Sequence, residues 1–407
     1  MKLEKVLTYK KGKSPFFVFE SEKQVLYLTP EYLRGNTAGN FISDFPGKVE
    51  VEDGDLLLLW DGSNAGEFFK GKSGVLSSTM VKFNFSLNVF NHEFLFYQLK
   101  GFEGYIKSQT NGTGIPHVDR ELLLGLEVKE FKETEQSHIA EILSTADVTI
   151  ANTEALIDKY QRIKTGLMQD LLTRGIDERG NIRNKATHKF TVKNGLEVPE
   201  EWDVDLLLNK CEVFGGKRLP KDHTYAEGNE GFRYLRVLDF YKKEVDYYSL
   251  ENLKKETYEI LKRYEIHPYE LFISIAGSIG YIGVLRPPVS EKIILTENAL
   301  RIVPQKQIIS DYLALLLNSD GLQRQIWSEI GTGGGVPKLA MHRVQTLRIC
   351  IPSFNEQLKI VEKMDTVSKL LKEHKNNLDK LLLIKIGLMQ DLLSGRVRVP
   401  EEMIKQT

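Results

Sequence analysis

The chain is a sequence duplication, and this repeat limits the folds open to it more than any other feature. The heptapeptide GLMQDLL occurs at Gly166–Leu172 and again at Gly387–Leu393, an offset of 221 residues (387 minus 166). The same offset holds upstream without a gap, since Glu135-Gln136 matches Glu356-Gln357. Agreement over this length in one register is not expected by chance, so the chain consists of two copies of one unit.

Each copy begins with a globular piece whose segments correspond with small gaps. The central segments, DLLLLWDGS and ELFISIAGS, each predict a buried strand that ends in a turn. The corresponding segments are KGKSP (Lys11–Pro15) with GKRLP (Gly216–Pro220), DLLLLWDGS (Asp55–Ser63) with ELFISIAGS (Glu270–Ser278), EFLFYQL (Glu93–Leu99) with DYLALLL (Asp311–Leu317), and Gly112, Gly114 and Pro116 with Gly333, Gly335 and Pro337.

A long helix follows each globular piece, at residues 135–172 and 356–393. Both segments carry apolar positions at alternating steps of three and four residues, the a/d seam of a coiled coil. A helix of this length is about 57 Å long and cannot be buried in one small domain, so each is expected to pair with its repeat. The seam residues are Leu143, Ala146, Ile150, Thr153, Ile157 and Tyr160 in the first helix and Met364, Val367, Leu371, His374, Leu378 and Leu381 in the second.

The predicted fold class is therefore mixed α+β, with two globular domains separated by two long antiparallel coiled-coil helices and related by a pseudo-two-fold axis. The predicted boundaries are 1–133 for the first globular domain, 134–195 for a central helical spacer, 196–352 for the second globular domain and 353–407 for a C-terminal helical spacer. At 407 residues the chain is too long for one ordinary core.

Composition narrows the class of protein. A hydrophobic content of 41% and a charged content of 27% are typical of a soluble globular protein. No apolar run is long enough to span a membrane, MKLEKVLTYKK lacks the apolar core of a signal peptide, and Cys211 and Cys350 form no metal or redox motif. These features predict a cytoplasmic protein. The net charge of −1 excludes a uniformly basic surface but allows a local basic face.

The stretch GEFFKGKS, Gly66–Ser73, matches the phosphate-binding pattern G-x-x-x-x-G-K-[S/T]. That pattern needs a helix starting at the Lys-Ser pair, whereas Ser73 is followed by glycine and by the β-prone VLSSTMVKFNF. The corresponding segment of the second copy, IGYIGVLRPPVS, has no Gly-Lys-Ser. We therefore interpret GEFFKGKS as a surface turn, and we find no metal-ligand spacing or nucleophile motif that would indicate catalysis.

Several polar and glycine-rich loops recur at matching places in both copies and are candidates for contact with DNA. Lysine and arginine attract phosphates, and glycine-rich turns present backbone N–H groups that approach phosphates closely. Taken singly, each is also readable as an ordinary solvated loop. The candidate residues are Lys11, Lys13, Ser63, Asn64, Lys72, Thr113, His117, Lys217, Arg218, Ser278, Thr332 and Lys338.

The ends of the two long helices carry more apolar side chains than one seam needs. Two interpretations stay open: these side chains pack against the chain's own globular domains, or they form a docking surface for a partner. The candidate partner-binding residues are Leu167, Met168, Leu171, Leu388, Met389 and Leu392.

The order of a globular domain, a long helix, a second globular domain and a second long helix resembles the specificity subunit of type I restriction-modification systems. The helix ends IKTGLMQDLLTRG (Ile163–Gly175) and IKIGLMQDLLSGRVRV (Ile384–Val399) are the most specific residues of this resemblance, which covers the whole chain. The pieces LLLLWDGSNAG and LFISIAGSIG and the turns GTGIPH and GGGVPK resemble the target-recognition domains of that family.

The resemblance implies a non-catalytic reader of double-stranded DNA. It implies that each globular domain reads one half of a split site, that the helices set the spacing and dock two methyltransferase subunits, and that endonuclease/translocase subunits join the complex. S-adenosylmethionine, ATP and Mg²⁺ would belong to those partners, with no cofactor or metal in this chain. The runner-up interpretation is a scaffold whose two domains bind proteins, and a nucleotide-dependent enzyme is a distant third.

Overall fold

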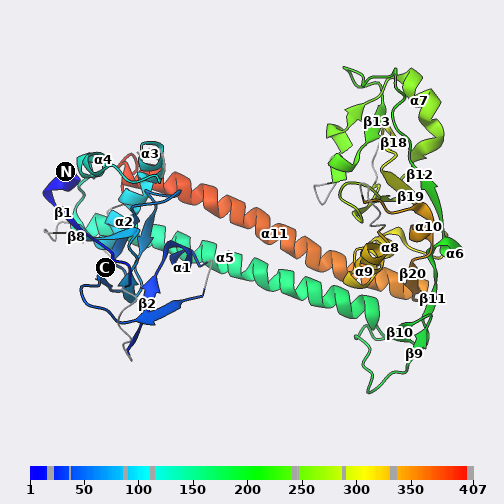
Figure 1. The fold of residues 1–407 in the computed structure, drawn as a ribbon, viewed down its shortest axis with the longest axis horizontal. Helices are drawn as coiled ribbons and strands as arrows, with labels where there is room; N and C mark the ends of the chain where they lie inside the picture. Colours follow the sequence, from blue (N-terminus) through cyan, green and yellow to red (C-terminus); the bar gives the residue numbers. More distant parts are fainter. Residues whose placement is uncertain are drawn as a thin grey trace. The chain divides into compact units, whose positions relative to one another are not determined.

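The computed structural model describes residues 1–15, 23–35, 38–85, 90–110, 115–240, 245, 247–286, 290–330 and 337–400. It divides into two compact units (Figure 1). Unit 1 comprises Met1–Leu156 and His374–Thr407, and unit 2 comprises Ile157–Glu373. Both long helices contribute residues to both units, because the division falls within α5 and within α11.

Unit 1 contains two four-stranded sheets. The first has the strand order β1-β8-β5-β6 and is antiparallel throughout, and the second has the order β3-β2-β7-β4, in which β2 and β7 are parallel. The strands are β1 (Leu7–Lys11), β2 (Gln24–Leu28), β3 (Asn40–Ser43), β4 (Glu50–Val51), β5 (Leu56–Leu59), β6 (Phe68–Lys70), β7 (Gly74–Leu76) and β8 (Met80–Phe85).

Unit 2 repeats this topology strand by strand. Its sheets have the orders β12-β19-β16-β17 and β14-β13-β18-β15, and the parallel pair is again the second and third strand, β13 and β18. The strands are β12 (Cys211–Gly215), β13 (Phe232–Leu235), β14 (Glu251–Asn252), β15 (Glu265–Ile266), β16 (Leu271–Ser274), β17 (Ile282–Val284), β18 (Lys292–Leu295) and β19 (Ala299–Pro304). The duplication inferred from the sequence is therefore a duplication of fold.

The buried central strands predicted from DLLLLWDGS and ELFISIAGS are confirmed as β5 and β16. All four residues of β5 are buried. In a strand with one face toward solvent, buried and exposed residues would alternate. Leu56 and Leu58 pack into the core shared with the helices, whereas Leu57 and Leu59 pack into the separate core that includes Leu28 of the second sheet. Both faces of the strand are covered, which explains its unbroken apolar run.

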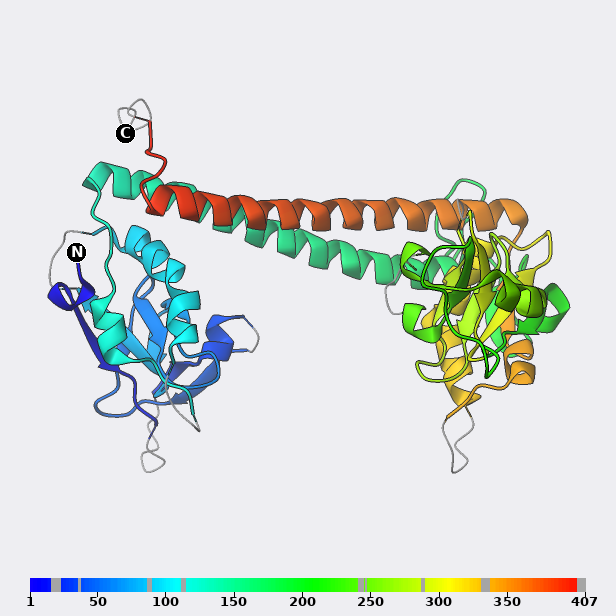
Figure 2. The same cartoon turned by 90° about the horizontal axis from the view of Figure 1, so that it is seen from above.

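The long helices are α5 (Glu133–Thr173) and α11 (Phe354–Leu393), which confirms the predicted helices at 135–172 and 356–393. All twelve seam residues are buried or half-buried, as the period predicts. Within unit 1 the start of α5 lies beside the end of α11, since Asp147 forms an ion pair with Lys385 (Figure 2). Within unit 2 the end of α5 is followed by Ile176, whose backbone N–H donates to Glu356 near the start of α11. The pairing is thus antiparallel in each unit.

The remaining helices are short and cover the sheets or connect them. In unit 1 they are η1 (Leu3–Lys5), α1 (Pro30–Leu33), α2 (His92–Gly101), α3 (Glu103–Ser108) and α4 (Arg120–Gly125). In unit 2 they are α6 (Leu207–Lys210), η2 (Val237–Phe240), η3 (Tyr247–Ser249), α7 (Lys255–Leu261), η4 (Lys262–Tyr264), α8 (Ser310–Leu317), α9 (Asp320–Ser328) and α10 (Met341–Gln345).

Unit 2 has two further strand pairs, a hairpin of β9 (Phe190–Lys193) and β10 (Leu196–Pro199), and a pair of β11 (Asp203–Leu206) with β20 (Arg348–Ile351). The sequence patterns did not predict the hairpin, which lies mostly within the segment 134–195 that we had assigned to a helical spacer. In unit 1, β2 ends at Leu28, because Thr29 caps α1 by accepting a hydrogen bond from the Tyr32 N–H.

Candidate nucleic-acid interface

In each unit, four loop segments lie together at one end of the sheets, and each segment of unit 1 has an equivalent segment in unit 2. In unit 1 the four are the segment after β1, the turn after β5, the turn between β7 and β8, and the segment leading into α4. In unit 2 they are the segments after β12 and β16, the turn between β18 and β19, and the segment leading into α10. We call these the strand-end surfaces of units 1 and 2.

A glycine fixes the first segment in each unit. A Cβ atom on Gly12 would lie 2.0 Å from the carbonyl oxygen of Ser77, and one on Gly216 would lie 1.9 Å from that of Thr296. No side chain fits there without moving backbone, so only glycine permits this approach. The residues that follow, Lys13 and Lys217, are therefore presented at the same place.

A tyrosine hydroxyl holds the same segment from the second sheet. Tyr27 donates to the carbonyl oxygen of Lys13 at 3.3 Å, and Tyr234 donates to that of Lys217 at 2.8 Å. Both tyrosines lie on the strand that runs parallel to its neighbour, β2 or β13. Each strand-end surface thus rests on a frame of backbone contacts that does not depend on the exposed side chains.

The turns after β5 and β16 are tied to the segments that carry His117 and Lys338. Asp61 and His117 form an isolated antiparallel bridge, and Ala276 and Lys338 form the matching one. The Val118 N–H donates to the Trp60 carbonyl at 3.0 Å, and the equivalent hydrogen bond in unit 2 is 2.9 Å long. Far-separated parts of the sequence therefore meet here, as the matching motifs suggested.

Most of the predicted DNA-contact residues lie on these surfaces, but among the described residues some of their side chains are bonded within the chain and others are not. Lys11 donates to the Asp61 carboxylate at 2.6 Å, and Arg218 donates from Nε to Glu297 at 2.7 Å. Ser278 is half-buried, and its carbonyl oxygen accepts a hydrogen bond from Ser274. Lys11 and Arg218 are exposed despite these ion pairs, and the other exposed members on these surfaces are Lys13, Ser63, Asn64, His117, Lys217 and Lys338. Thr113 and Thr332 lie outside the described residues.

Unit 1 also has a cleft of about 370 Å³ beside its strand-end surface. Ser63 and Asn64 line one side of it, and Arg34 lines another. Arg34 is held by a two-point hydrogen bond to Glu67, so its charge is already neutralised. The acidic lining residues Glu31 and Asp61 form ion pairs with Arg34 and Lys11, so the cleft offers mainly hydroxyl and amide groups.

The structure separates Lys72 from the other predicted contacts, and we correct its assignment. Lys72 follows β6, whose pairing places it near the start of β5, whereas Ser63 follows the end of β5. Its ammonium lies 5.1 Å from the centre of the Tyr32 ring. The segment is no phosphate loop, because β7 follows it and the Ser73 N–H donates to Asp53 at 2.6 Å. The interpretation of GEFFKGKS as a surface turn is correct only for its end, where Lys72 and Ser73 are exposed, because Phe68–Lys70 form β6 with both phenylalanines buried.

Replacing Lys72 with alanine is therefore expected to change neither nucleotide binding nor DNA binding. Calorimetric titration should detect no ATP binding by the wild-type chain or by the variant. The slope of log affinity for DNA against log salt should also stay unchanged, because a lost phosphate contact would reduce it by about one unit. ATP binding that Lys72→Ala abolishes would contradict this interpretation of the turn.

The candidate partner-binding residues divide into two groups. Leu171 and Leu392 have exposed fractions of 0% and 5% and belong to the cores of units 2 and 1, so their assignment to a docking surface is wrong. They are buried because the helix ends pack against the globular part of the same unit. Leu167, Met168, Leu388 and Met389 are half-buried against the same cores.

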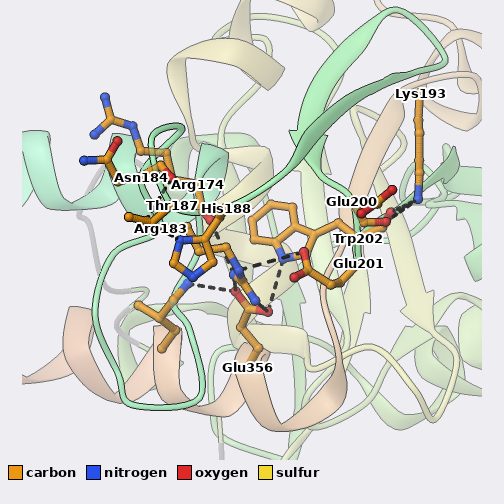
Figure 3. A network of polar contacts seen from close by, with 11 residues as sticks. Arg174, Arg183, Asn184, Thr187, His188, Lys193, Glu200, Glu201, Trp202 and Glu356 are labelled. Carbon is orange, nitrogen blue, oxygen red and sulfur yellow. Dashed lines mark hydrogen bonds and ion pairs between the residues drawn. The ribbon is translucent and has the colours of Figure 1, made fainter.

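A buried network at the start of α11 was not predicted as functional or structural (Figure 3). The Glu356 carboxylate accepts hydrogen bonds from the Arg183 guanidinium, from the Trp202 ring N–H at 3.1 Å and from the Ile176 N–H at 2.8 Å. Arg183 and Glu356 are both about nine-tenths buried. Unit 1 has a simpler counterpart, since Arg398 donates to Glu135. We call these contacts the Glu-Arg locks.

The residue after each glutamate ties the helix to the globular part. Gln136 accepts from the Asn91 N–H at 2.8 Å at the start of α2, and Gln357 accepts from the Ile309 N–H at 2.9 Å at the start of α8. The repeated Glu-Gln pair was visible in the sequence, but a repeat alone does not reveal a hydrogen-bond partner. Its two side chains join each long helix to its unit.

The described residues contain no group of three or more His, Cys, Asp or Glu side chains placed to hold a metal ion. Burial raises the pKa of the Cys211 thiol to about 12 and that of Cys350 to about 11, so neither is a reactive thiolate at neutral pH. None of the helices within the described ranges is both long and apolar enough to cross a membrane.

Comparison with known proteins gives consistent matches along the chain. The family model described as "Type I restriction modification DNA specificity domain" matches residues 1–162 and 199–381. The specificity subunit of the type I restriction enzyme MjaVIII from Methanocaldococcus jannaschii is 32% identical over 403 residues, covering 97% of this chain and 91% of that protein. The EcoBI specificity subunit from Escherichia coli is 23% identical over 377 residues, covering 90% and 78%.

Solved structures share the fold. The S subunit of a type I restriction-modification system from M. genitalium aligns with a TM-score of 0.58 at 16% identity, covering 96% of this chain and 95% of that one. A chain from a study of complex assembly and conformational transition of a type I restriction-modification system aligns with a TM-score of 0.57 at 15% identity, covering 97% and 96%.

Proposed function

The chain belongs to the family of type I restriction-modification DNA specificity proteins, and from this premise we propose that each strand-end surface reads one half of a bipartite DNA site. The chain itself is non-catalytic in this proposal. It supplies sequence recognition to a complex whose other subunits carry out methylation and cleavage.

The observation that carries this proposal is a repeated frame with unlike side chains. Gly12 and Gly216 and the two tyrosine hydroxyls build the same loop arrangement in both units. The side chains on that arrangement differ, since the bridged residue after β5 is Asp61 and the matching one after β16 is Ala276. Ser63 and Ser278 match, but the residues that follow them are Asn64 and Ile279. Base edges are read by side chains, while a shared backbone frame positions them, so one architecture reads two different half-sites.

The lysines of the strand-end surfaces support contact with the DNA backbone. Lys13 and Lys217 are exposed at equivalent positions, and neither forms an ion pair with an acidic side chain in the described part of the chain. Free ammonium groups release counterions from phosphates and add affinity without sequence preference. The net charge of −1 indicates that much of the affinity comes from partner subunits.

We propose that two methyltransferase subunits dock on the paired helices, because the duplication supplies two equivalent stretches, and that endonuclease/translocase subunits join them. S-adenosylmethionine, ATP and Mg²⁺ belong to those partners in this proposal. The half-buried apolar residues Leu167, Met168, Leu388 and Met389 stay candidates for docking, and α11 adds exposed ones. The exposed apolar residues near its end are Leu382, Leu383, Ile384 and Ile386.

The function is tested by sequencing methylated bases in cells that carry the chain with its methyltransferase subunit, and in cells that lack the chain. The expected result is one split motif that depends on this chain. A gel-shift assay with the purified complex should show binding to that motif and weaker binding to DNA with either half altered. A complex that forms but binds no DNA under any condition would favour a protein-binding scaffold instead.

Replacing both Leu383 and Ile386 with aspartate is expected to abolish co-purification with the methyltransferase subunit while the chain stays folded. These side chains have exposed fractions of 68% and 53%, so charge there costs little in the free chain but is expensive in an apolar interface. Co-purification and the melting temperature are the two measurements.

Two matched changes make this result interpretable. Val192→Asp alters an equally exposed valine in the β9–β10 hairpin, with an exposed fraction of 70%, and should leave complex formation intact. Leu392→Asp places a charge in the core of unit 1 and should lower the melting temperature strongly. Full co-purification of the Leu383/Ile386 variant would place the docking surface elsewhere.

A further inference from the structure

The two strand-end surfaces place a pair of side chains at the same two positions but with different chemistry. The first position follows the lysine after β1 or β12 and is Ser14 in unit 1 and Arg218 in unit 2. The second lies in the turn after β7 or β18 and is Ser78 or Glu297. The equivalence rests on the glycine frame, because Gly12 packs on the Ser77 carbonyl and Gly216 on the Thr296 carbonyl.

The pair is bonded in both units. In unit 1 the Ser14 hydroxyl donates to the Ser78 hydroxyl at 3.0 Å. In unit 2 the Arg218 Nε donates to a Glu297 carboxylate oxygen at 2.7 Å. The same cross-loop contact is therefore made once by two neutral hydroxyls and once by an ion pair. We call residues 14 and 78, and residues 218 and 297, the cross-loop pairs.

Resting on the function proposed above, we propose that the cross-loop pairs determine sequence specificity, and that Arg218 of unit 2 reads a guanine. The Arg218 side chain has an exposed fraction of 79%, so its guanidinium reaches out from the surface. Only Nε is taken up by Glu297, which leaves the two terminal nitrogens as a fork of donors. Such a fork matches the O6 and N7 acceptors of guanine in the major groove.

Glu297 is built to hold the arginine. Its second carboxylate oxygen accepts from the Thr296 hydroxyl at 3.0 Å and lies 3.5 Å from the Tyr234 hydroxyl, which also supports the Lys217 carbonyl. Burial raises the pKa of Glu297, but the hydrogen bonds from Arg218, from its own backbone N–H and from Thr296, with the charge of Arg218, together outweigh burial, so the pKa lies below its usual value. The carboxylate is thus ionised at neutral pH and restrains the guanidinium through its Nε.

The acidic partner also argues against a simple phosphate contact. A carboxylate at 2.7 Å offsets the positive charge that would attract a phosphate, and it would itself be repelled by the DNA backbone. The neighbouring Lys217 is exposed and suits phosphate contact better. The two adjacent residues therefore have different roles in this proposal. Lys217 adds affinity for DNA of any sequence, and Arg218 adds preference for one base.

The test uses the complete complex with its methyltransferase subunit and reads the methylated motif by sequencing. We expect Arg218→Lys, which keeps the charge and loses the fork, to reduce the preference for guanine at one position of one half-site by about tenfold or more. The double change Arg218→Ser with Glu297→Ser should have the same effect, and the other half-site should keep its bases.

The reciprocal change is made in unit 1. Ser14→Arg with Ser78→Glu should alter a position in the other half-site and leave the half-site of unit 2 unchanged. Lys217→Ala should weaken modification of all sequences alike without changing the motif. Lys185→Ala with Glu197→Gln removes an equally exposed ion pair, near the hairpin at the opposite end of unit 2 from β13 and β18 in Figure 1, and should change nothing.

The outcomes separate this inference from the function on which it rests. If the wild-type complex modifies no split site, the proposed function fails. If it does, and Arg218→Lys leaves the guanine preference unchanged or lowers modification of every sequence equally, the reading role of Arg218 is overturned. It is equally overturned if the unit 1 and unit 2 variants alter the same half-site.

Discussion

Replacing Glu356 with alanine should lower the free energy of unfolding of unit 2 by about 3–5 kcal/mol, the usual cost of breaking a buried ion pair by removing one partner. The change leaves the buried Arg183 guanidinium without its carboxylate partner, and it leaves the Trp202 and Ile176 N–H groups without their acceptor. A Cβ on Gly175 would lie 2.1 Å from the Glu356 carboxylate, so the network is packed so closely against this residue that only glycine fits at position 175. Thermal unfolding of the full chain measures the effect.

A graded series tests the cause. Glu135→Ala in the lock of unit 1 should cost clearly less, because it leaves behind Arg398, which is 62% exposed, whereas Glu356→Ala leaves behind Arg183, which is 9% exposed. The exposed pair Lys185–Glu197 should contribute at most about 1 kcal/mol. Equal losses for the buried and the exposed pairs would show that burial does not set the contribution of the Glu356 lock.

Lengthening both long helices by four residues should shift the preferred site to one with a spacer longer by one or two base pairs. The insertions belong between Leu156 and Ile157 and between Glu373 and His374, where the division between the units crosses α5 and α11. Four residues add about 6 Å and a turn of about 40° to each helix. B-DNA advances about 3.4 Å and turns about 34–36° per base pair, so one or two base pairs compensate.

Changing both helices keeps their seams matched, and a four-residue insertion is a form that coiled coils accommodate by local unwinding. Modification of sites with graded spacers gives the optimum. Four residues inserted at Asn194-Gly195, in the β9–β10 hairpin, should leave the optimum unchanged. If the optimum spacer length is unchanged after the insertions into α5 and α11, or if bases within a half-site change instead, the helices do not set the spacing.

Local periodicity and repetition were enough to predict the parts of the fold that one segment determines. The helices at 135–172 and 356–393 and the strands in DLLLLWDGS and ELFISIAGS were predicted within two or three residues, since each carries its own apolar pattern. The β9–β10 hairpin was missed because FTVKNGLEVP is short and lies among polar residues. Its Asn194-Gly195 turn, with φ of 49° and 78°, was the available signal.

The candidate interface was predicted in part, for a physical reason. Matching loops identified Lys13 and Lys217, which the glycine frame does place together. Lys72 was misplaced because a motif gives residue types and not the end of the strand at which they lie. The Glu297 partner of Arg218 was missed because the two residues are 79 positions apart in sequence, and only the folded sheets bring them together.

The division of the units along the chain has a consequence for how the protein folds as it is synthesised. Unit 2 is one uninterrupted stretch, Ile157–Glu373, and its core can close once that stretch has left the ribosome. Unit 1 begins earlier but needs Leu392 and Val399 for its core. The part translated first is therefore completed last, the reverse of the usual N-terminal-first order. Until then the cavity that Leu392 fills stays open, so the nascent first unit carries exposed apolar surface for most of its synthesis.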